Sequence, residues 1–288
     1  MFGRIDTKDT ALVLQQVEGM YREVFSRGDA TFVRRAFEWA EQCFTGRYAD
    51  YMPIDARYHD WEHTLQGTLC LARLVHGRHR AGAQPALPQR IVELGLLAIL
   101  FHDTGYLKRK SDAQGSGAKY TAIHVMRSIA FADEFLSHQG FSRSDVMAVQ
   151  NMIRCTGVNA NLPAIPFQEE AERIMGYALG TADLLGQMAD SAYVEKLPVL
   201  YQEFAEASRF DPAHAESLRE FSSEDDLIKK TPGFWQHYVL PRISNEFGRL
   251  HVFLNDPFPD GPNLYLQKVE ENMSRINGRA TRNVATAT

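Results

Sequence analysis

Apolar residues recur at helical spacing along nearly the whole chain, and this periodicity constrains the fold more than any other feature of the sequence. They follow one another at steps of three and four residues between positions 12 and 25, and segment 89–101 is apolar on nearly all sides. Short breaks that contain Gly and Pro separate these segments, and no convincing pair of strands is found. The sequence therefore predicts an all-α bundle of about ten helices, with segment 89–101 at its centre.

Residues suited to cap helices mark several expected boundaries. Asp29 can cap the helix that follows it, and Gly140 suits the position just after the end of another helix. Ser142 opens a sequence typical of a capping box. Thr231 and Pro232 are typical of an N-cap and a first helical residue, so we expect a further helix to begin there.

The chain is expected to form one continuous domain. Residues 1–57 supply N-terminal helices that pack on a core formed by residues 58–276, and residues 277–288 are small, polar and expected to be a flexible tail. Segment 104–118 combines three glycines with a basic run and is expected to be a mobile loop before a helix over 120–139.

Composition and charge argue against several classes of partner. The 288 residues include 31 Lys and Arg against 36 Asp and Glu, a net charge of -5, so a broad nucleic-acid-binding surface is not expected. No apolar run approaches the ~18 residues of a membrane span, so we expect no membrane partner. Three cysteines are too few for a disulfide framework and favour a reducing compartment, so the expected location is cytoplasmic. A homodimer is left open.

Several histidines and acids occupy positions that suggest chemistry. His59 and His63 are four residues apart at the start of an expected helix, so they share one face. His102 and Asp103 end the most apolar helix, and Asp183 lies among small and apolar residues, where a carboxylate is costly unless it is paired or binds metal. His63, His102, Asp103 and Asp183 form a donor set suited to Zn, Mn, Fe or Mg. A metal there would activate water, and His59 would act as general acid or base.

These residues, taken in order, resemble a known family. The run Tyr58-His59-Asp60-Trp61-Glu62-His63, the pair His102-Asp103 and the later Asp183 resemble the HD superfamily of metal-dependent phosphohydrolases, most closely the class I cyclic-nucleotide phosphodiesterases. The resemblance covers about residues 58 to 243. It implies an HD-domain helical bundle that hydrolyses a phosphodiester or phosphate ester in a nucleotide, with a 3′,5′-cyclic nucleotide as the first candidate substrate.

The resemblance also implies roles for individual residues, and two divalent ions. The ligands of the first ion would be His63, His102, Asp103 and Asp183. Asp103 matches the carboxylate that bridges to the second ion and is therefore counted as catalytic. His59 matches the general acid that protonates the leaving oxygen. Phe234 matches the aromatic residue that stacks on the base.

The remaining candidate substrate contacts are less firmly indicated. Thr231 stands where the family has a base-reading glutamine, and helix capping explains this threonine at least as well. We therefore expect weak selectivity among bases unless another side chain supplies the missing hydrogen bonds. Tyr58 belongs to the signature, His124 either contacts phosphate or a second ion's water or packs in the core, and Lys108 either reaches a phosphate or is a solvated loop residue. Tyr106 falls where the family has a further histidine.

Two alternative functions stay open. An HD-type di-iron oxygenase needs histidines for a second iron, and segment 152–156 offers none. A non-catalytic nucleotide-binding regulatory module is the other alternative. The presence of His59 beside all four ligands argues against it, because a binding module needs no general acid.

Overall fold

The computed structural model describes residues 5–211 and 220–285. Within these ranges it holds ten α-helices and no strand, with only three isolated β-bridges between loops, which confirms the all-α prediction. The α-helices are α1 (Thr10–Val24), α2 (Ala30–Phe44), α3 (Trp61–Arg80), α4 (Gln89–Phe101), α5 (His124–His138), α6 (Arg143–Arg154), α7 (Glu170–Met188), α8 (Tyr193–Phe210), α10 (Glu224–Phe234) and α11 (Leu264–Ala285). None of these helices is long and apolar enough to cross a membrane.

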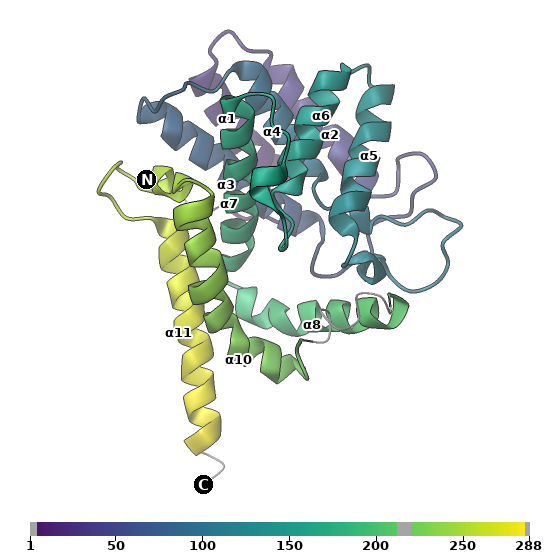
Figure 1. The fold of residues 1–288 in the computed structure, drawn as a ribbon, viewed down its shortest axis with the longest axis vertical. Helices are drawn as coiled ribbons and strands as arrows, with labels where there is room; N and C mark the ends of the chain where they lie inside the picture. Colours follow the sequence, from purple (N-terminus) through teal and green to yellow (C-terminus); the bar gives the residue numbers. More distant parts are fainter. Residues whose placement is uncertain (1–4, 212–219, 286–288) are drawn as a thin grey trace.

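Helices α3 and α7 pack along each other at the centre of the bundle (Figure 1). Their backbones approach closely, since a Cβ added at Gly186 of α7 would lie 2.9 Å from the backbone of Gln66 in α3. Helices α1 and α4 also pack on α3, α6 packs on both α4 and α7, and α5 packs on α6. Helix α8 crosses below this bundle in Figure 1. His63 on α3 and Asp183 on α7, two of the predicted metal ligands, therefore lie on two closely packed helices.

Helix α4 lies in the interior, as its pattern predicts. Leu94, Leu97, Ile99, Leu100 and Phe101 are all buried and belong to one apolar cluster that runs through the described chain. Each such side chain contributes roughly 1.5–3 kcal/mol through burial. The helix ends at Phe101, and the two residues that follow it, His102 and Asp103, are polar and buried in the core.

Most of the expected helix ends are confirmed. The Asp29 side chain accepts a hydrogen bond from the Thr31 backbone at the start of α2. Ser142 forms the expected capping box with Asp145, and Gly140 follows α5 with a φ of +81°, which favours glycine. Helix α5, however, begins at His124 and not at residue 120, because residues 117–120 form a short 3-10 helix instead.

The helix start expected at Thr231 and Pro232 is wrong. Helix α10 begins at Glu224, and Ser223 is its N-cap. Three acids fill its first turn, where they interact favourably with the helix dipole, and this upstream signal determines the start. Thr231 lies inside the helix, and its hydroxyl donates to the Leu227 carbonyl at 2.8 Å. Two π-helical segments, Trp235–Val239 and Arg242–Glu246, then flank Pro241.

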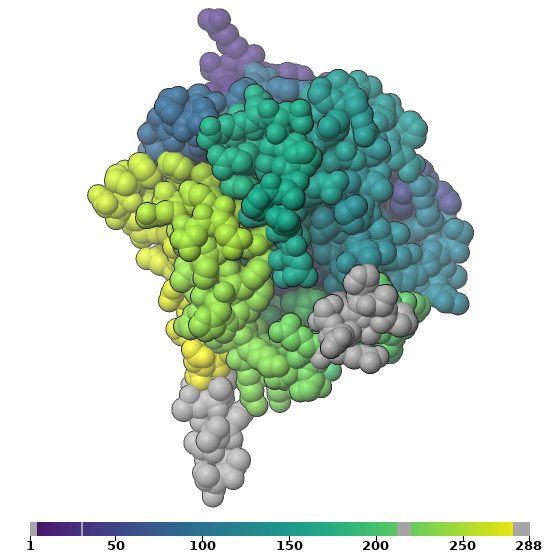
Figure 2. All heavy atoms as spheres, in the orientation of Figure 1, coloured from purple at the N-terminus to yellow at the C-terminus, as the bar shows by residue number. Residues whose placement is uncertain are grey.

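The C-terminal segments lie together on one side of the bundle, as the yellow and yellow-green atoms of Figure 2 show. Helix α11 is anchored by the buried side chains of Val269, Met273 and Ile276. The expected tail, residues 277–288, is helical as far as Ala285, and its last three residues lie outside the described ranges.

Candidate active site

Four predicted metal ligands converge in the core from three different helices. His63 lies in the first turn of α3, where the Asp60 side chain caps the helix by accepting from the His63 backbone at 2.9 Å. His63 Nε2 is 3.1 Å from Asp103 Oδ2 and 3.3 Å from Asp183 Oδ1. His102 Nε2 is 3.2 and 3.4 Å from the same two oxygens. All four side chains are buried.

The hydrogen bonding of His102 indicates that the cluster needs a cation or a proton between its donor atoms. His102 Nδ1 lies 2.7 Å from the Ile99 carbonyl oxygen, so Nδ1 carries a proton, and in the neutral ring Nε2 presents its lone pair to the cluster. Neither His102 Nε2 nor Asp103 Oδ2 makes a hydrogen bond of good geometry to any described group, and both atoms are buried. A lone pair and a carboxylate oxygen 3.2 Å apart repel each other unless a cation or proton lies between them.

The electrostatics of the cluster favour positive charge. Burial alone lowers the pKa of His63, but the negative charges of the nearby Asp103 and Asp183 outweigh it and raise that pKa to about 9. The same two acids raise the pKa of His102 against its burial. Burial opposes ionisation of Asp103 and Asp183, but the two histidines hold both carboxyl pKa values below their ordinary range.

These observations fit a divalent metal. One donor atom from each of His63, His102 and Asp103 lies within 4.8 Å of the other two, and Asp183 contacts both histidines. Two imidazole nitrogens and two carboxylate oxygens are a donor set that suits zinc, manganese, iron or magnesium.

His59 stands beside the cluster and is oriented by a residue that the sequence did not reveal. Its Nδ1 lies 2.6 Å from Glu203 Oε2 on α8, and Glu203 Oε1 accepts from the backbone amides of Arg57 and Tyr58 at 2.7 and 2.8 Å. Burial opposes ionisation of Glu203, yet His59 and the two amides hold its pKa below the ordinary value. The carboxylate therefore holds His59 Nδ1–H and leaves Nε2 free of this interaction.

A compact group of three rings connects His59 with His124. The Tyr106 ring is nearly parallel to both imidazoles, with centroids 4.4 Å from His59 and 4.8 Å from His124. His124 Nδ1 lies 2.6 Å from the Thr121 carbonyl, so Nε2 faces Asp103 Oδ1 at 3.8 Å. Burial lowers the pKa of His124, although Asp103 opposes the shift. Asp103 thus directs Oδ2 toward His63 and His102 and Oδ1 toward His124.

The remaining predicted contacts lie in different surroundings. The Tyr58 hydroxyl donates to Gln187 Oε1 at 2.9 Å, and Gln187 Nε2 donates to Asp183 Oδ1 at 3.3 Å. Tyr58 thus helps to position Asp183 through Gln187 and does not contact the cluster carboxylates itself. Lys108 is buried, and its ammonium pairs with Asp55 at 2.9 Å and with the Gly115 carbonyl. This lysine ties its loop to the body of the protein, and no contact places it at the cluster.

Thr231 and Phe234 differ in what they offer to a ligand. Thr231 is buried with its hydroxyl committed to the helix, so it is not free to bind a base. Phe234 is 38% exposed and stacks on Tyr238 with centroids 4.9 Å apart. The exposed ring is thus available as a flat apolar surface.

Two residues of the site were missed in the sequence, Glu203 and Gln187, and Tyr106 was noted only for its position after His102-Asp103, without the ring contacts it makes. Glu203 and His59 are 144 positions apart, and Gln187 and Tyr58 are 129 apart. No short-range pattern reports such pairs. Tyr106, by contrast, follows Asp103 by three residues, and its apolar flank offered a signal of burial.

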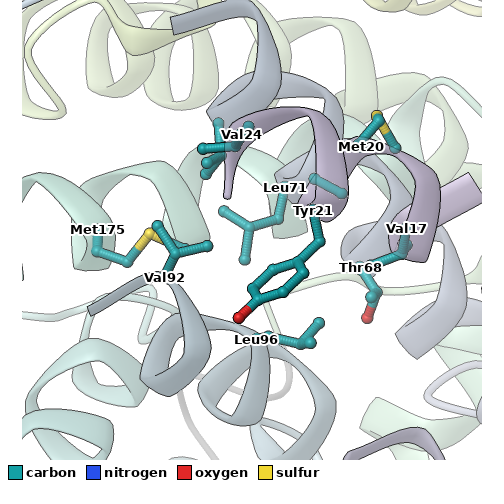
Figure 3. Close-up of a pocket in the computed structure, with 11 residues that line it drawn as sticks. Val17, Met20, Tyr21, Val24, Thr68, Leu71, Val92, Leu96 and Met175 are labelled. Atoms are coloured by element: carbon teal, nitrogen blue, oxygen red, sulfur yellow. The ribbon is translucent and has the colours of Figure 1, made fainter. Parts of the chain in front are cut away.

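A cavity away from the His–Asp cluster lies between α1, α3, α4 and α7 (Figure 3). Its lining is apolar apart from the hydroxyl groups of Tyr21 and Thr68, and Tyr21 donates to the buried Glu93 at 2.7 Å. Figure 3 shows Val92, Leu96 and Met175 around the Tyr21 ring. Its described lining holds no cluster of histidines and acids like the one formed by His63, His102, Asp103 and Asp183.

The fold and the site together define an all-α protein with a buried histidine–aspartate cluster. Residues 110–256, just over half of the chain, match the Npun_R2479-like family model, and the chain belongs to that family. The matched range contains His124, Asp183, Glu203 and Phe234, whereas His59, His63, His102 and Asp103 precede it. No curated protein matches the chain.

Proposed function

We propose that this protein is a metal-dependent phosphohydrolase that cleaves a phosphodiester or phosphate ester in a nucleotide, with a 3′,5′-cyclic nucleotide as the first substrate to test. The observation that carries the proposal is the juxtaposition of two elements. Four buried donors converge without hydrogen bonds that would satisfy His102 Nε2 and Asp103 Oδ2, and a carboxylate-oriented His59 stands beside them.

The donors would hold a divalent metal through His63, His102, Asp103 and Asp183, and Asp103 would share a second, weaker ion. A bound metal would supply Lewis-acid activation of water and neutralise charge on the phosphoryl oxygens. His59 protonates the leaving oxygen from Nε2, while Glu203 holds Nδ1 and stabilises the protonated ring. The two backbone amides on Glu203 Oε1 keep that carboxylate ionised and in place.

The ring group formed by His59, Tyr106 and His124 gives the site a second polar edge. His124 Nε2 faces the outer oxygen of Asp103, where it can contact a phosphate or a water molecule of the second ion. The exposed face of Phe234 supplies an apolar wall for a base. We also propose a cytoplasmic location, since Cys43, Cys70 and Cys155 are all buried free thiols.

The decisive experiment is a hydrolysis panel on metal-analysed protein with cyclic mononucleotides, cyclic dinucleotides, nucleoside monophosphates and nucleoside triphosphates. We expect release of a 5′-nucleotide or phosphate that stops on chelation and returns when metal is added back. Full activity after complete metal removal, or no hydrolysis by protein with stoichiometric metal, would contradict the proposal. Consumption of dioxygen by the iron-loaded protein would favour the oxygenase alternative instead.

A further inference from the structure

We propose that Arg154 reads the base of the substrate and that it selects guanine over adenine. This inference rests on the proposed function, because it assumes a nucleotide whose base stacks on Phe234. Arg154 is the last residue of α6, and its side chain is half-buried. Its Nε atom is buried and has no hydrogen-bond partner. Within the described part of the chain, the only hydrogen bond of the guanidinium runs from Nη1 to the sulfur of Met126, at 4.0 Å.

A nearby arginine, Arg242, has the hydrogen-bond partners that Arg154 lacks. Arg242 is also near the 157–158 loop, but its Nη1 pairs with Glu246 at 3.0 Å and its Nη2 donates to the Gly157 carbonyl at 3.3 Å. Arg154 has no such ion pair among the described residues. Nε is covered by protein, so a ligand would reach this guanidinium at Nη1 and Nη2, which have no oxygen acceptor among the described residues. A ligand that supplies such acceptors gains affinity.

The end of α6, where Arg154 lies, packs against α7 one turn from Asp183 of the cluster. A Cβ added at Gly180, one turn before Asp183, would come 3.0 Å from the carbonyl oxygen of Cys155, the residue that follows Arg154. Met126, its partner in α5, is two residues beyond His124, whose Nε2 faces Asp103. The end of α6 is therefore beside both α7 and the start of α5 that flank the cluster.

A chain of contacts then connects Arg154 with the aromatic wall. Val158 follows Arg154 by one turn, and its carbonyl accepts from the Tyr238 hydroxyl at 2.9 Å. Tyr238 in turn stacks on Phe234. Met126 and Val158 are among the most exposed apolar side chains described, at 57% and 58%. The end of α6 therefore contacts α7 near Asp183 on one side and, through Val158, the Tyr238–Phe234 pair on the other. The exposed side chains of Met126 and Val158 beside Arg154 suit a flat ligand with polar edges.

The chemistry of the guanidinium selects among bases. Arginine is a rigid fork of donors that matches two adjacent acceptors, and guanine presents O6 and N7 as such a pair. Adenine presents N7 beside the N6 amino donor, which opposes a second donor. Thr231 cannot take this role because its hydroxyl is committed to the Leu227 carbonyl. Arg154 is therefore the side chain that replaces the missing amide.

The test compares wild type with Arg154→Met, which removes the donors, and Arg154→Lys, which keeps the charge at the end of α6 but loses the fork. Arg143→Met is the matched control, because Arg143 lies at the other end of the same helix and pairs with Asp133. Each full-length, metal-loaded protein is assayed for kcat/KM on cyclic GMP and cyclic AMP. Binding of 5′-GMP and 5′-AMP is measured by calorimetry as an independent readout.

We expect wild type to prefer cyclic GMP and Arg154→Met to lose roughly 5- to 150-fold in kcat/KM for cyclic GMP, with little change for cyclic AMP. Arg154→Lys should lose most of the preference, and Arg143→Met should keep it. Equal losses on both nucleotides would overturn base reading and assign Arg154 to the phosphate instead. Hydrolysis without any guanine preference in wild type would overturn this inference and leave the proposed function intact. Absence of both hydrolysis and nucleotide binding would overturn both.

Discussion

Glu203 Oε2 lies 2.6 Å from His59 Nδ1, and the same carboxylate accepts two backbone amides through its other oxygen. Three donors on one buried carboxylate fix its position and, through it, the plane and tautomer of the imidazole. Glu203 therefore fixes the orientation of His59, the general acid of the proposed reaction, and it belongs to α8, which supplies none of the four proposed metal ligands.

Glu203→Gln should lower turnover by roughly 10²–10⁴-fold and leave metal content unchanged, because His59 loses the charge that orients it and stabilises its protonated form. The measurement pairs kcat with elemental analysis of the same sample. Glu195→Gln, an exposed change in α8 that breaks a pair with Arg275, is the control. Loss of metal in Glu203→Gln would show that the carboxylate supports the donors and not the acid.

Removal of one donor should separate ligands from the acid. Asp103→Ala is expected to lose both metal and activity, since this carboxylate contacts both histidine donors and faces His124. His59→Ala is expected to keep its metal and lose turnover, by roughly 10²–10⁴-fold. The number of metal ions per chain, measured on the purified variants, shows which residues are metal ligands. Similar metal contents in the two variants would contradict the division of roles.

Phe234→Ala should raise KM for every nucleotide substrate by a similar factor, on the order of 5- to 150-fold, because stacking on an aromatic ring tolerates any base. Phe258→Ala is a matched control. That ring is 42% exposed and stacks on Phe253 with centroids 5.4 Å apart, yet it belongs to a different loop. An unchanged KM in Phe234→Ala would show that a base does not bind against this ring.

Gly105→Ala should destabilise the protein by about 1–3 kcal/mol, because the added Cβ would lie 2.0 Å from the His124 carbonyl oxygen and the start of α5 must shift. The free energy of unfolding in urea measures the effect. Gly19→Ala is the control, since its Cβ meets no atom within 4 Å and lies inside α1, where alanine is favoured. Equal stability of both variants would contradict the close approach.

Asp190 should contribute stability that depends on pH. It is ion-paired with Lys196 at 2.7 Å and accepts from Gln66 at 2.9 Å, and against its partial burial these partners lower its pKa. A lowered folded-state pKa means that the contribution is complete above the unfolded pKa of about 3.9 and is lost as pH falls through the folded value. Asp190→Asn should therefore cost about 1–3 kcal/mol at about pH 6 and less at about pH 3.5. A pH-independent difference in unfolding free energy would contradict this.

The parts of the fold that sequence could predict are those that local chemistry determines. Helical spacing placed α4 in the core, and Asp29 and Ser142 marked helix starts because an N-cap acts within three residues. The expectation that His59 and His63 share one helix face is wrong, because α3 begins at Trp61 and His59 precedes its N-cap, Asp60. The two rings are still close, with centroids 5.5 Å apart, because the segment before the cap turns back toward the helix. The helix start predicted at Thr231–Pro232 was wrong because two helix-capping signals occur in this segment. Ser223, followed by three acids, is the stronger signal and begins the helix.

The rest of the site depends on which helices cross. Glu203 approaches His59 only because α8 lies under the start of α3, and nothing near Glu203 in the sequence distinguishes it from the other acids of that helix. The ring contacts of Tyr106 likewise follow from the meeting of the α4 end with the α5 start. Long-range packing fixes such pairs, and short windows of sequence do not report it.

The close approach of α3 and α7 at Gly186 has a thermodynamic consequence. The donors come from α3, from α7 and from the end of α4, so they are near one another only in the folded protein. An ion that binds this arrangement draws the folding equilibrium toward the native state, and each tenfold rise in free ion above its dissociation constant adds about 1.4 kcal/mol to the free energy of unfolding. The melting temperature of the protein therefore rises with its affinity for the added ion. Comparing the melting temperatures measured with zinc, manganese, iron and magnesium ranks the affinities of the four ions without any assay of catalysis.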